Sequence, residues 1–372
     1  MISVDYFNVS NEQTFDNIDM YGCIREAYTP VLWLNDNRVI EFSESHVKFV
    51  VLGIGGSSLG GQAIKCAFND LSVKFLDNIC PDSFFREVNE SIAENAGFIV
   101  ISKSGETIET LAQLSAILPK FDTDKISKRF LVITEDKNST LRNIGVKYDM
   151  TFIEHPKDVG GRFSLFSPVG MFPAYLMGLN VHKFKEGAQT AVDQGYDTRI
   201  ASFLEKPNHV FMNYSSKLHK FKEWIAQIYA ESTGKDGLGI TPLLPTGTTD
   251  QHSQLQLYLG GPKDKSFTFF IETGMKCENF DHSCQIEILR GKSLNDLFLA
   301  EGFATLATLE MTKSPVRAFK FDSLTEFELG YFFMYFMIEV IASCQKYLKV
   351  DPFDQPHVEI GKKLATKRLS EL

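Results

Sequence analysis

The sequence predicts an α/β fold with two parallel sheets in tandem, and three observations lead to this prediction. Short, nearly continuous apolar runs alternate with longer amphipathic stretches from residue 47 onward. That alternation is typical of parallel strands that are buried on both faces and joined by helices. A similar rhythm starts again near residue 208. The chain has 372 residues, which is too long for one ordinary core and suits two domains.

The first unit is expected to hold five strands, because each apolar run is short and rich in branched residues. The expected strands are residues 47–53, 73–77, 97–102, 129–134 and 150–154. Two amphipathic stretches between the strands, 59–70 and 106–121, are expected as helices. We therefore assign residues 46–200 to a first domain, a mainly parallel sheet flanked by helices.

The second unit repeats this pattern and is assigned to residues 201–346. Its expected strands are residues 209–216, 266–273 and 315–321. Its expected helices are residues 217–230, 293–313 and 324–348. Residues 1–45 are mixed and polar without strong periodicity, so they are expected to form an N-terminal arm. Residues 347–372 are expected to form a C-terminal helical segment.

Composition and charge exclude several classes of protein. The formal net charge of −9 argues against a nucleic-acid-binding face, which needs clustered basic residues. An anionic ligand would therefore be held by a few local cations. The apolar run at residues 329–338 is shorter than the roughly 18 residues that a membrane span requires. We expect a helix buried on all sides there and no membrane association.

The six cysteines are expected to be reduced thiols in a cytoplasmic protein, because the first fifteen residues lack the pattern of a signal peptide. Cys277, His282 and Cys284 lie close together in the sequence and resemble half of a zinc site. No second pair of ligands completes the pattern. The sequence therefore predicts no bound metal.

A glycine-rich loop follows the first strand, in the stretch VVLGIGGSSLGGQAI at residues 50–64. A dinucleotide, a nucleoside triphosphate and a sugar phosphate would each favour glycines at this place. The triphosphate loop is excluded because no Gly-Lys-Ser/Thr sequence follows. The dinucleotide pattern is incomplete, since Ser58 replaces its third glycine, although Asp77 lies where a ribose-binding acid is expected.

The turn after residues 97–102 favours a phosphate monoester. Ser102, Ser104 and Thr107 supply hydroxyl groups, Lys103 adds a positive charge, and a helix N-terminus follows. Ser104 acting only as a helix cap is an equally good explanation of this turn taken alone. Two such turns at the carboxyl edge of one parallel sheet nevertheless favour a shared anion site.

Six motifs together resemble the phosphoglucose (glucose-6-phosphate) isomerase family. In chain order they are GIGGSSLGG, ISKSGETIET, DVGGRFSLFSPVG, ESTGKDGLGI, TTDQHS and FDQPHVEIGKK, which run from about residue 50 to residue 363. The resemblance implies two sugar-isomerase (SIS) domains and the reversible interconversion of glucose 6-phosphate and fructose 6-phosphate in glycolysis and gluconeogenesis. It also implies a homodimer and no metal or redox cofactor.

The resemblance assigns roles to residues of this sequence. Glu231 is the base that moves the proton, Arg162 is the cation near the enediolate, and His252 with Lys362 opens the sugar ring. His252 is expected to reach the site of a neighbouring subunit. The residues expected to contact substrate are Gly56, Ser57, Ser102, Lys103, Ser104, Thr107, Gly161, Gln227 and Gln355.

Spacing adds further expectations about these residues. Gln227 and Glu231 are one helical turn apart and share a face. Asp250 is placed to orient the His252 ring. Asp354 is expected as the N-cap of a helix that carries Gln355 and Lys362, about 10.5 Å apart along its axis. Without the surrounding motifs, Arg162 and Glu231 would be interpreted as a structural ion pair.

Two other functions remain open at this point. One is a sugar-phosphate-binding SIS protein without catalysis, although the glutamate, arginine, histidine and lysine together argue against it. The other is an NAD- or NADP-dependent oxidoreductase. The chain is also shorter than most members of the family, and His357 stands where the family usually has a small residue.

Overall fold

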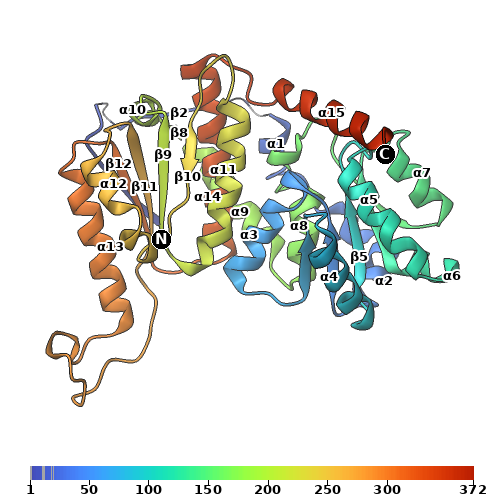
Figure 1. The fold of residues 1–372 in the computed structure, drawn as a ribbon, viewed down its shortest axis with the longest axis horizontal. Helices are drawn as coiled ribbons and strands as arrows, with labels where there is room; N and C mark the ends of the chain where they lie inside the picture. Colours follow the sequence, from blue (N-terminus) through green and yellow to red (C-terminus); the bar gives the residue numbers. More distant parts are fainter. Residues whose placement is uncertain (1, 11–12, 18, 20) are drawn as a thin grey trace.

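The computed structural model describes residues 2–10, 13–17, 19 and 21–372. Two five-stranded sheets lie side by side, with helices between and around them (Figure 1). The predicted α/β class, with two mainly parallel sheets, is confirmed. A short antiparallel pair, β2 (Phe15–Asp16) with β8 (Tyr196–Asp197), lies outside both sheets.

The first sheet is parallel throughout and has the order β4-β3-β5-β6-β7. Its strands are β3 (Phe49–Leu52), β4 (Val73–Leu76), β5 (Gly97–Ile101), β6 (Phe130–Thr134) and β7 (Thr151–Glu154). Successive side chains of β3 pack on opposite faces of the sheet. Val50 and Leu52 lie in the core on one face, and Phe49 and Val51 lie in the core on the other. Apolar residues at every position thus cover both faces, as parallel sheets require.

Helices cover both faces of this sheet. One face packs against α4 (Pro81–Ala93), α5 (Ile108–Ile117), α6 (Thr123–Arg129) and α7 (Thr140–Lys147). The other face packs against α2 (Asn37–Glu44) and α8 (Pro168–Leu176). Helix α3 (Leu59–Phe68) follows β3 and faces the second unit, where it packs against α11 (His219–Thr233).

The second sheet has the order β1-β12-β11-β9-β10 and is parallel except for β1. Its strands are β1 (Ile2–Phe7), β9 (Asn208–Tyr214), β10 (Thr241–Leu243), β11 (Lys265–Glu272) and β12 (Val316–Phe321). One face packs against α12 (Leu255–Gly260) and α13 (Leu294–Glu310). The other packs against α11 and α14 (Glu326–Ala342).

The N-terminal segment differs from the expected arm. Its strand β1 pairs antiparallel with β12, from Ile2 opposite Phe321 to Phe7 opposite Val316. Ile2, Val4 and Tyr6 pack on the central core, an alternation that the sequence analysis did not recognise. Two short helices, α1 (Gly22–Arg25) and α10 (Ile200–Leu204), precede β3 and β9 in the chain, respectively.

Helix α14 confirms the expected buried helix, since every residue from 329 to 342 is buried. It packs against α9 (Val181–Gln194), and a π-helical turn, η8 (Ser343–Leu348), continues it. Of the described helices, the stretch Glu326–Leu348 alone has the length and hydropathy of a membrane span. However, 89% of its most apolar window is buried inside the protein.

The C-terminal segment ends in helix α15 (Glu359–Ser370), which has no buried residue. A 3₁₀ turn, η9 (Pro356–Val358), precedes it. Asp354 is therefore not the N-cap of this helix, and Gln355 lies outside it. The carboxylate of Asp354 instead forms a 2.7 Å ion pair with Lys235, which draws the chain inward before the helix begins.

Candidate active site

The glycine loop after β3 forms a 3₁₀ turn, η2 (Gly55–Ser57), that packs against a second turn, η4 (Gly161–Phe163). A Cβ atom at Gly56 would lie 2.2 Å from the carbonyl carbon of Gly161, so a side chain at Gly56 would separate the two turns. A Cβ at Gly161 would meet nothing within 4 Å. Open space beside the backbone of Gly161 therefore remains for a ligand.

The serine turn after β5 lies next to this loop, because β3 and β5 are neighbours in the sheet. The Ser102 hydroxyl lies 2.9 Å from the Thr107 hydroxyl and accepts a hydrogen bond from the amide of Gly105 at 3.2 Å. Ser104 accepts one from the amide of Glu106 at 3.1 Å. Thr107, not Ser104, occupies the N-cap position of α5, and its side chain makes no capping bond.

Lys103 is half-buried beside the same turn. Its Nζ donates to the carbonyl of Lys157 at 2.8 Å and lies 3.4 Å from the Glu135 carboxylate. His155, two residues before Lys157, is 1% exposed, and burial lowers its pKa to about 4. A neutral histidine therefore adds no positive charge at this edge at neutral pH, and Lys103 is the cation of the turn.

Arg162 in η4 is buried, and all of its guanidinium nitrogens donate hydrogen bonds. The acceptors are Ser232 Oγ at 2.9 Å, Gln355 Oε1 at 2.6 Å, Glu231 Oε2 at 3.3 Å, the carbonyl of Asp354 at 3.0 Å and the carbonyl of Pro352. Burial lowers the pKa of Arg162, and the Glu231 carboxylate opposes that shift. An arginine still remains charged, so the site holds a fixed cation.

Glu231 lies on α11, whose other face is buried. Gln227, one turn earlier, donates to Glu231 Oε1 at 3.0 Å, so the expected common face is confirmed. The Gln227 amide nitrogen lies 3.0 Å from the position of a Cβ built on Gly55. The Glu231 side chain is 33% exposed, so substrate or water can reach it. Helix α11 thus brings the carboxylate to the glycine loop of the first unit.

A cavity of about 220 Å³ opens beside this carboxylate. Glu231, Gln355 and His357 share its lining with Ala230, Gly234, Lys235, Pro356 and Val358. Sequence reasoning missed Ser232 and Lys235, which hold Arg162 and the 351–354 segment in place. Both follow Glu231 closely in the motif ESTGK, which was the available signal.

The structure does not join His252 or Lys362 to this cluster. Among the described residues, neither forms a hydrogen bond or ion pair with Arg162 or Glu231. Lys362 is exposed and pairs with Glu359 at 2.7 Å. His252 is exposed in the 3₁₀ turn η6 (Thr249–His252). Asp250 accepts from the Thr246 amide and from Ser253, so it does not orient the His252 ring as expected.

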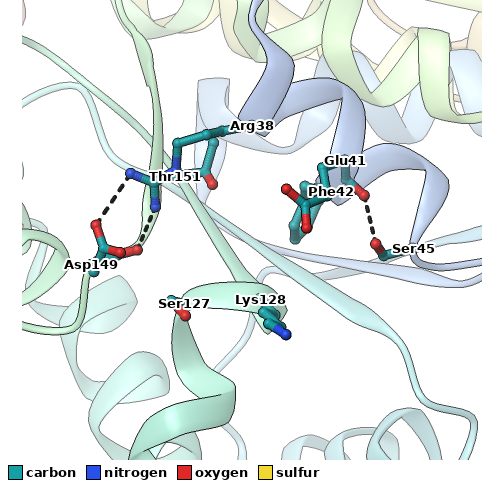
Figure 2. Close-up of a pocket in the computed structure, with 8 residues that line it drawn as sticks. All are labelled: Arg38, Glu41, Phe42, Ser45, Ser127, Lys128, Asp149 and Thr151. Atoms are coloured by element: carbon teal, nitrogen blue, oxygen red, sulfur yellow. Dashed lines mark hydrogen bonds and ion pairs between the residues drawn. The ribbon is translucent and has the colours of Figure 1, made fainter.

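Figure 2 shows a different pocket, of about 220 Å³, lined by Arg38, Glu41, Phe42, Ser45, Ser127, Lys128, Asp149 and Thr151. Thr151 begins β7 and Asp149 precedes it, so this pocket lies at the amino edge of the first sheet, opposite the serine turn. Arg38 is paired with Asp149 at 3.2 Å. Lys128 lies in the last turn of α6, where a helix C-terminus favours a cation. The pairing of Arg38 with Asp149 and the position of Lys128 therefore explain both basic residues without a ligand.

The part of the chain that the structure describes contains no cluster of metal-ligating side chains. No group of three or more histidine, cysteine, aspartate or glutamate side chains there could hold a metal ion. Cys277 and Cys284 lie in the long connection between β11 and α13 as free thiols.

Solved structures with similar folds define the class of the protein. A hypothetical protein from Thermus thermophilus superposes with a TM-score of 0.86 at 29% identity, over 94% of this chain and 90% of that one. A glucose-6-phosphate isomerase from Chlamydia trachomatis superposes with a TM-score of 0.75 at 20% identity, over 94% of this chain and 78% of that one. The fold is therefore that of the two-domain SIS proteins.

Sequence comparison narrows this class. The family model described as phosphoglucose isomerase matches residues 42–263. A glucose-6-phosphate isomerase from Carboxydothermus hydrogenoformans is 34% identical over 87% of this chain and 79% of its own length. One from Thermus thermophilus is 33% identical over 87% of this chain and 83% of its own length. The chain belongs to the phosphoglucose isomerase family.

Proposed function

We propose that this protein catalyses the reversible isomerisation of glucose 6-phosphate and fructose 6-phosphate. The observation that carries the proposal is the cluster in which Arg162 holds Glu231 and Gln355 beside the glycine loop. The family and its curated relatives support the same reaction. As an aldose–ketose isomerase, the protein needs no redox cofactor, because the hydrogen lost from one carbon returns to its neighbour.

In this scheme the phosphate binds at the carboxyl edge of the first sheet. Ser57, Ser102, Ser104 and Thr107 donate hydroxyl hydrogens, Lys103 supplies charge, and the α5 N-terminus supplies amide donors. The Ser102 and Thr107 hydroxyls lie 2.9 Å apart, within one hydrogen bond, so they are adjacent, and each can turn its hydrogen to the phosphate when the phosphate binds. Gly161 leaves space for the sugar beside its backbone, and Gly56 lets the turn that carries Ser57 pack directly against the turn that carries Gly161.

Glu231 takes the proton from C2 of the open-chain sugar and returns it to C1. The intermediate is a cis-enediolate, whose negative charge the buried Arg162 guanidinium stabilises. Gln227 and Gln355 hold the carboxylate and the guanidinium in register and contact the sugar. The ion pair between Arg162 and Glu231 is thus part of the catalytic arrangement.

Ring opening requires a second proton-handling group, and we assign it to His252 with Lys362. His252 is exposed on its own subunit, which suits donation to a neighbouring copy in a homodimer. The reaction also suits a cytoplasmic protein. Residues 46–200 then bind the phosphate, residues 201–346 supply the base and the histidine, and residues 347–372 supply Gln355 and Lys362.

The test is a coupled assay of the wild type and of the Glu231→Gln variant with glucose 6-phosphate. Loss of the base is expected to lower kcat by about 10²–10⁴-fold. Glu223→Gln is the matched control, since Glu223 lies on the same helix and pairs with Lys220, away from the cluster. Binding of fructose 6-phosphate without turnover by the wild type would identify a binding protein instead. Protection against unfolding by NAD or NADP would favour the oxidoreductase.

A further inference from the structure

Lys222 is a buried lysine for which the proposed reaction has no use. It lies in the first turn of α11, and the residue is 3% exposed. Its ammonium group donates to the carbonyls of Leu244 at 2.7 Å and Pro245 at 2.9 Å, and to the Thr246 hydroxyl at 2.7 Å. An ammonium has three hydrogens, so all of its donors are used on one short segment.

That segment leads directly to His252. Thr246 and Asp250 are tied together, because the Thr246 amide donates to the Asp250 carboxylate at 2.7 Å and the Asp250 amide donates to the Thr246 carbonyl at 2.8 Å. Asp250 lies in η6, two residues before His252. The position of η6 therefore depends on the position of Thr246.

The helix that holds Lys222 also carries Gln227 and Glu231. Glu231 lies nine positions after Lys222, which is about 13.5 Å along a continuous helix. Lys222 thus connects two parts of the proposed machinery that share no hydrogen bond or ion pair among the described residues. One end of α11 presents the base, and the other fixes the segment that presents the histidine.

Stability alone does not account for a lysine at this position. No described carboxylate forms an ion pair with Lys222, and the segment that it holds offers only neutral oxygens. Burial lowers the pKa of Lys222 to about 8, against the opposing charges of Asp250 and Glu223. A buried cation is expensive to desolvate, so the three hydrogen bonds that fix residues 244–246 come at a cost in stability.

We propose that Lys222 is a positioning residue, which holds residues 244–246 so that η6 presents His252 at a fixed place relative to the helix that carries Glu231. This inference rests on the proposed function. If His252 serves the neighbouring subunit, the same lysine connects the base of one active site with the histidine of the other.

A double-mutant cycle with His252 tests this role. Lys222→Met is expected to lower kcat at least about tenfold with KM within about twofold, because small misplacements of a reacting group cost up to about 10²-fold. His252→Ala is expected to lower kcat about 10²-fold or more. In the double variant, Lys222→Met is expected to have no further effect, since it acts only through His252. Lys220→Met, a more exposed lysine on the same helix, is the matched control and should keep wild-type kcat.

Multiplying losses in the double variant would overturn the inference, as would wild-type kcat in a folded Lys222→Met protein. Should Lys222→Met not fold, Thr246→Ala removes one of the three acceptors. It is expected to lower kcat by several fold in the wild type and not at all beside His252→Ala, and any other result contradicts the inference. An inactive wild type contradicts the proposed function itself, which separates the two failures.

Discussion

The carboxyl edges of the two sheets carry similar residues in different arrangements. In the first sheet, Ser102 and Lys103 follow β5, and Glu135 follows the neighbouring strand β6. In the second sheet, Ser215 and Lys217 follow β9, and Glu272 ends the neighbouring strand β11. In each sheet, a hydroxyl and an ammonium group thus follow one strand, and a carboxylate lies at the end of the neighbouring strand.

The two edges differ in what the donors bind. At the second edge, Ser215 donates to Glu272 at 2.7 Å and Lys217 pairs with it at 2.5 Å, while Glu272 is 1% exposed. At the first edge, Glu135 pairs with Lys137 at 2.5 Å and lies farther from Lys103. At the second edge the serine and lysine thus bind a carboxylate of the protein itself. At the first edge the hydroxyl groups remain available to an anionic ligand.

The largest expected effect concerns acid stability at the first edge. The pKa of His155 is lowered to about 4 by burial, so the unfolded chain binds the proton first as the pH falls below about 6.5. Above about pH 6.5, His155 is neutral in both states and does not lower the free energy of unfolding. On going to about pH 4, the free energy of unfolding falls by about 3 kcal/mol, at about 1.36 kcal/mol per pKa unit. Denaturant unfolding of wild type and His155→Asn at both pH values measures it. Equal losses in the two proteins would contradict the assignment.

Removing the internal anion of the second edge is expected to have the next largest effect. Glu272→Ala leaves the buried Ser215 hydroxyl without its acceptor, so the free energy of unfolding should fall by about 2 kcal/mol. KM for glucose 6-phosphate should not change. Glu135→Ala, whose two lysine partners are partly exposed, should lose less than about 1 kcal/mol. If Glu135→Ala lowers the free energy of unfolding more than Glu272→Ala does, the predicted difference between the two edges is wrong.

The lysines at the two edges should differ in how much they contribute to substrate binding. Lys103→Ala is expected to raise KM for glucose 6-phosphate about tenfold or more with little change in kcat, since a charge-assisted phosphate contact exists in ground and transition states alike. Lys217→Ala should leave KM within about twofold, because Lys217 already binds Glu272. Steady-state kinetics of both variants measures the two KM values. An equal rise in KM would contradict the prediction that the phosphate binds at the first edge and not at the second.

The smallest expected difference is between the two serines. Ser102→Ala removes one neutral donor, worth about 1 kcal/mol, and should raise KM about fivefold. Ser215→Ala should leave KM unchanged and lower only the melting temperature, because Ser215 faces Glu272 inside the protein. If Ser215→Ala raises KM as much as Ser102→Ala, the second edge also contacts substrate.

The sequence predicted the elements whose signal is local. Apolar runs identified β3, β5, β6, β9 and β11, and amphipathic or continuously apolar patterns identified α11 and α14, because burial on both faces leaves continuous apolar stretches. Within the two five-stranded sheets, strands β1 and β10 were missed, as was the short pair of β2 and β8 outside them. Strand β1 is stabilised by β12, far away in the sequence, and β10 has three residues including a proline.

The candidate site was predictable in its residue types and less so in its contacts. The resemblance to the family implied that Arg162 and Glu231 belong to one site, and helical spacing placed Gln227 on the same face as Glu231. The carbonyls of Pro352 and Asp354 that bind Arg162 carry no sequence signal, since every residue has a carbonyl group. The same holds for the backbone acceptors of Lys222.

The edge position of β1 has a consequence for how the molecule is made. Residues 2–7 leave the ribosome before the rest of the fold, yet their hydrogen-bonding partner, residues 316–321, is synthesised near the end. The strands of the first sheet all lie within residues 49–154, so this sheet can form while β1 is still unpaired. Closing a loop of this length is slow. Cutting the chain between its two sheets would therefore yield a second half that lacks a border strand.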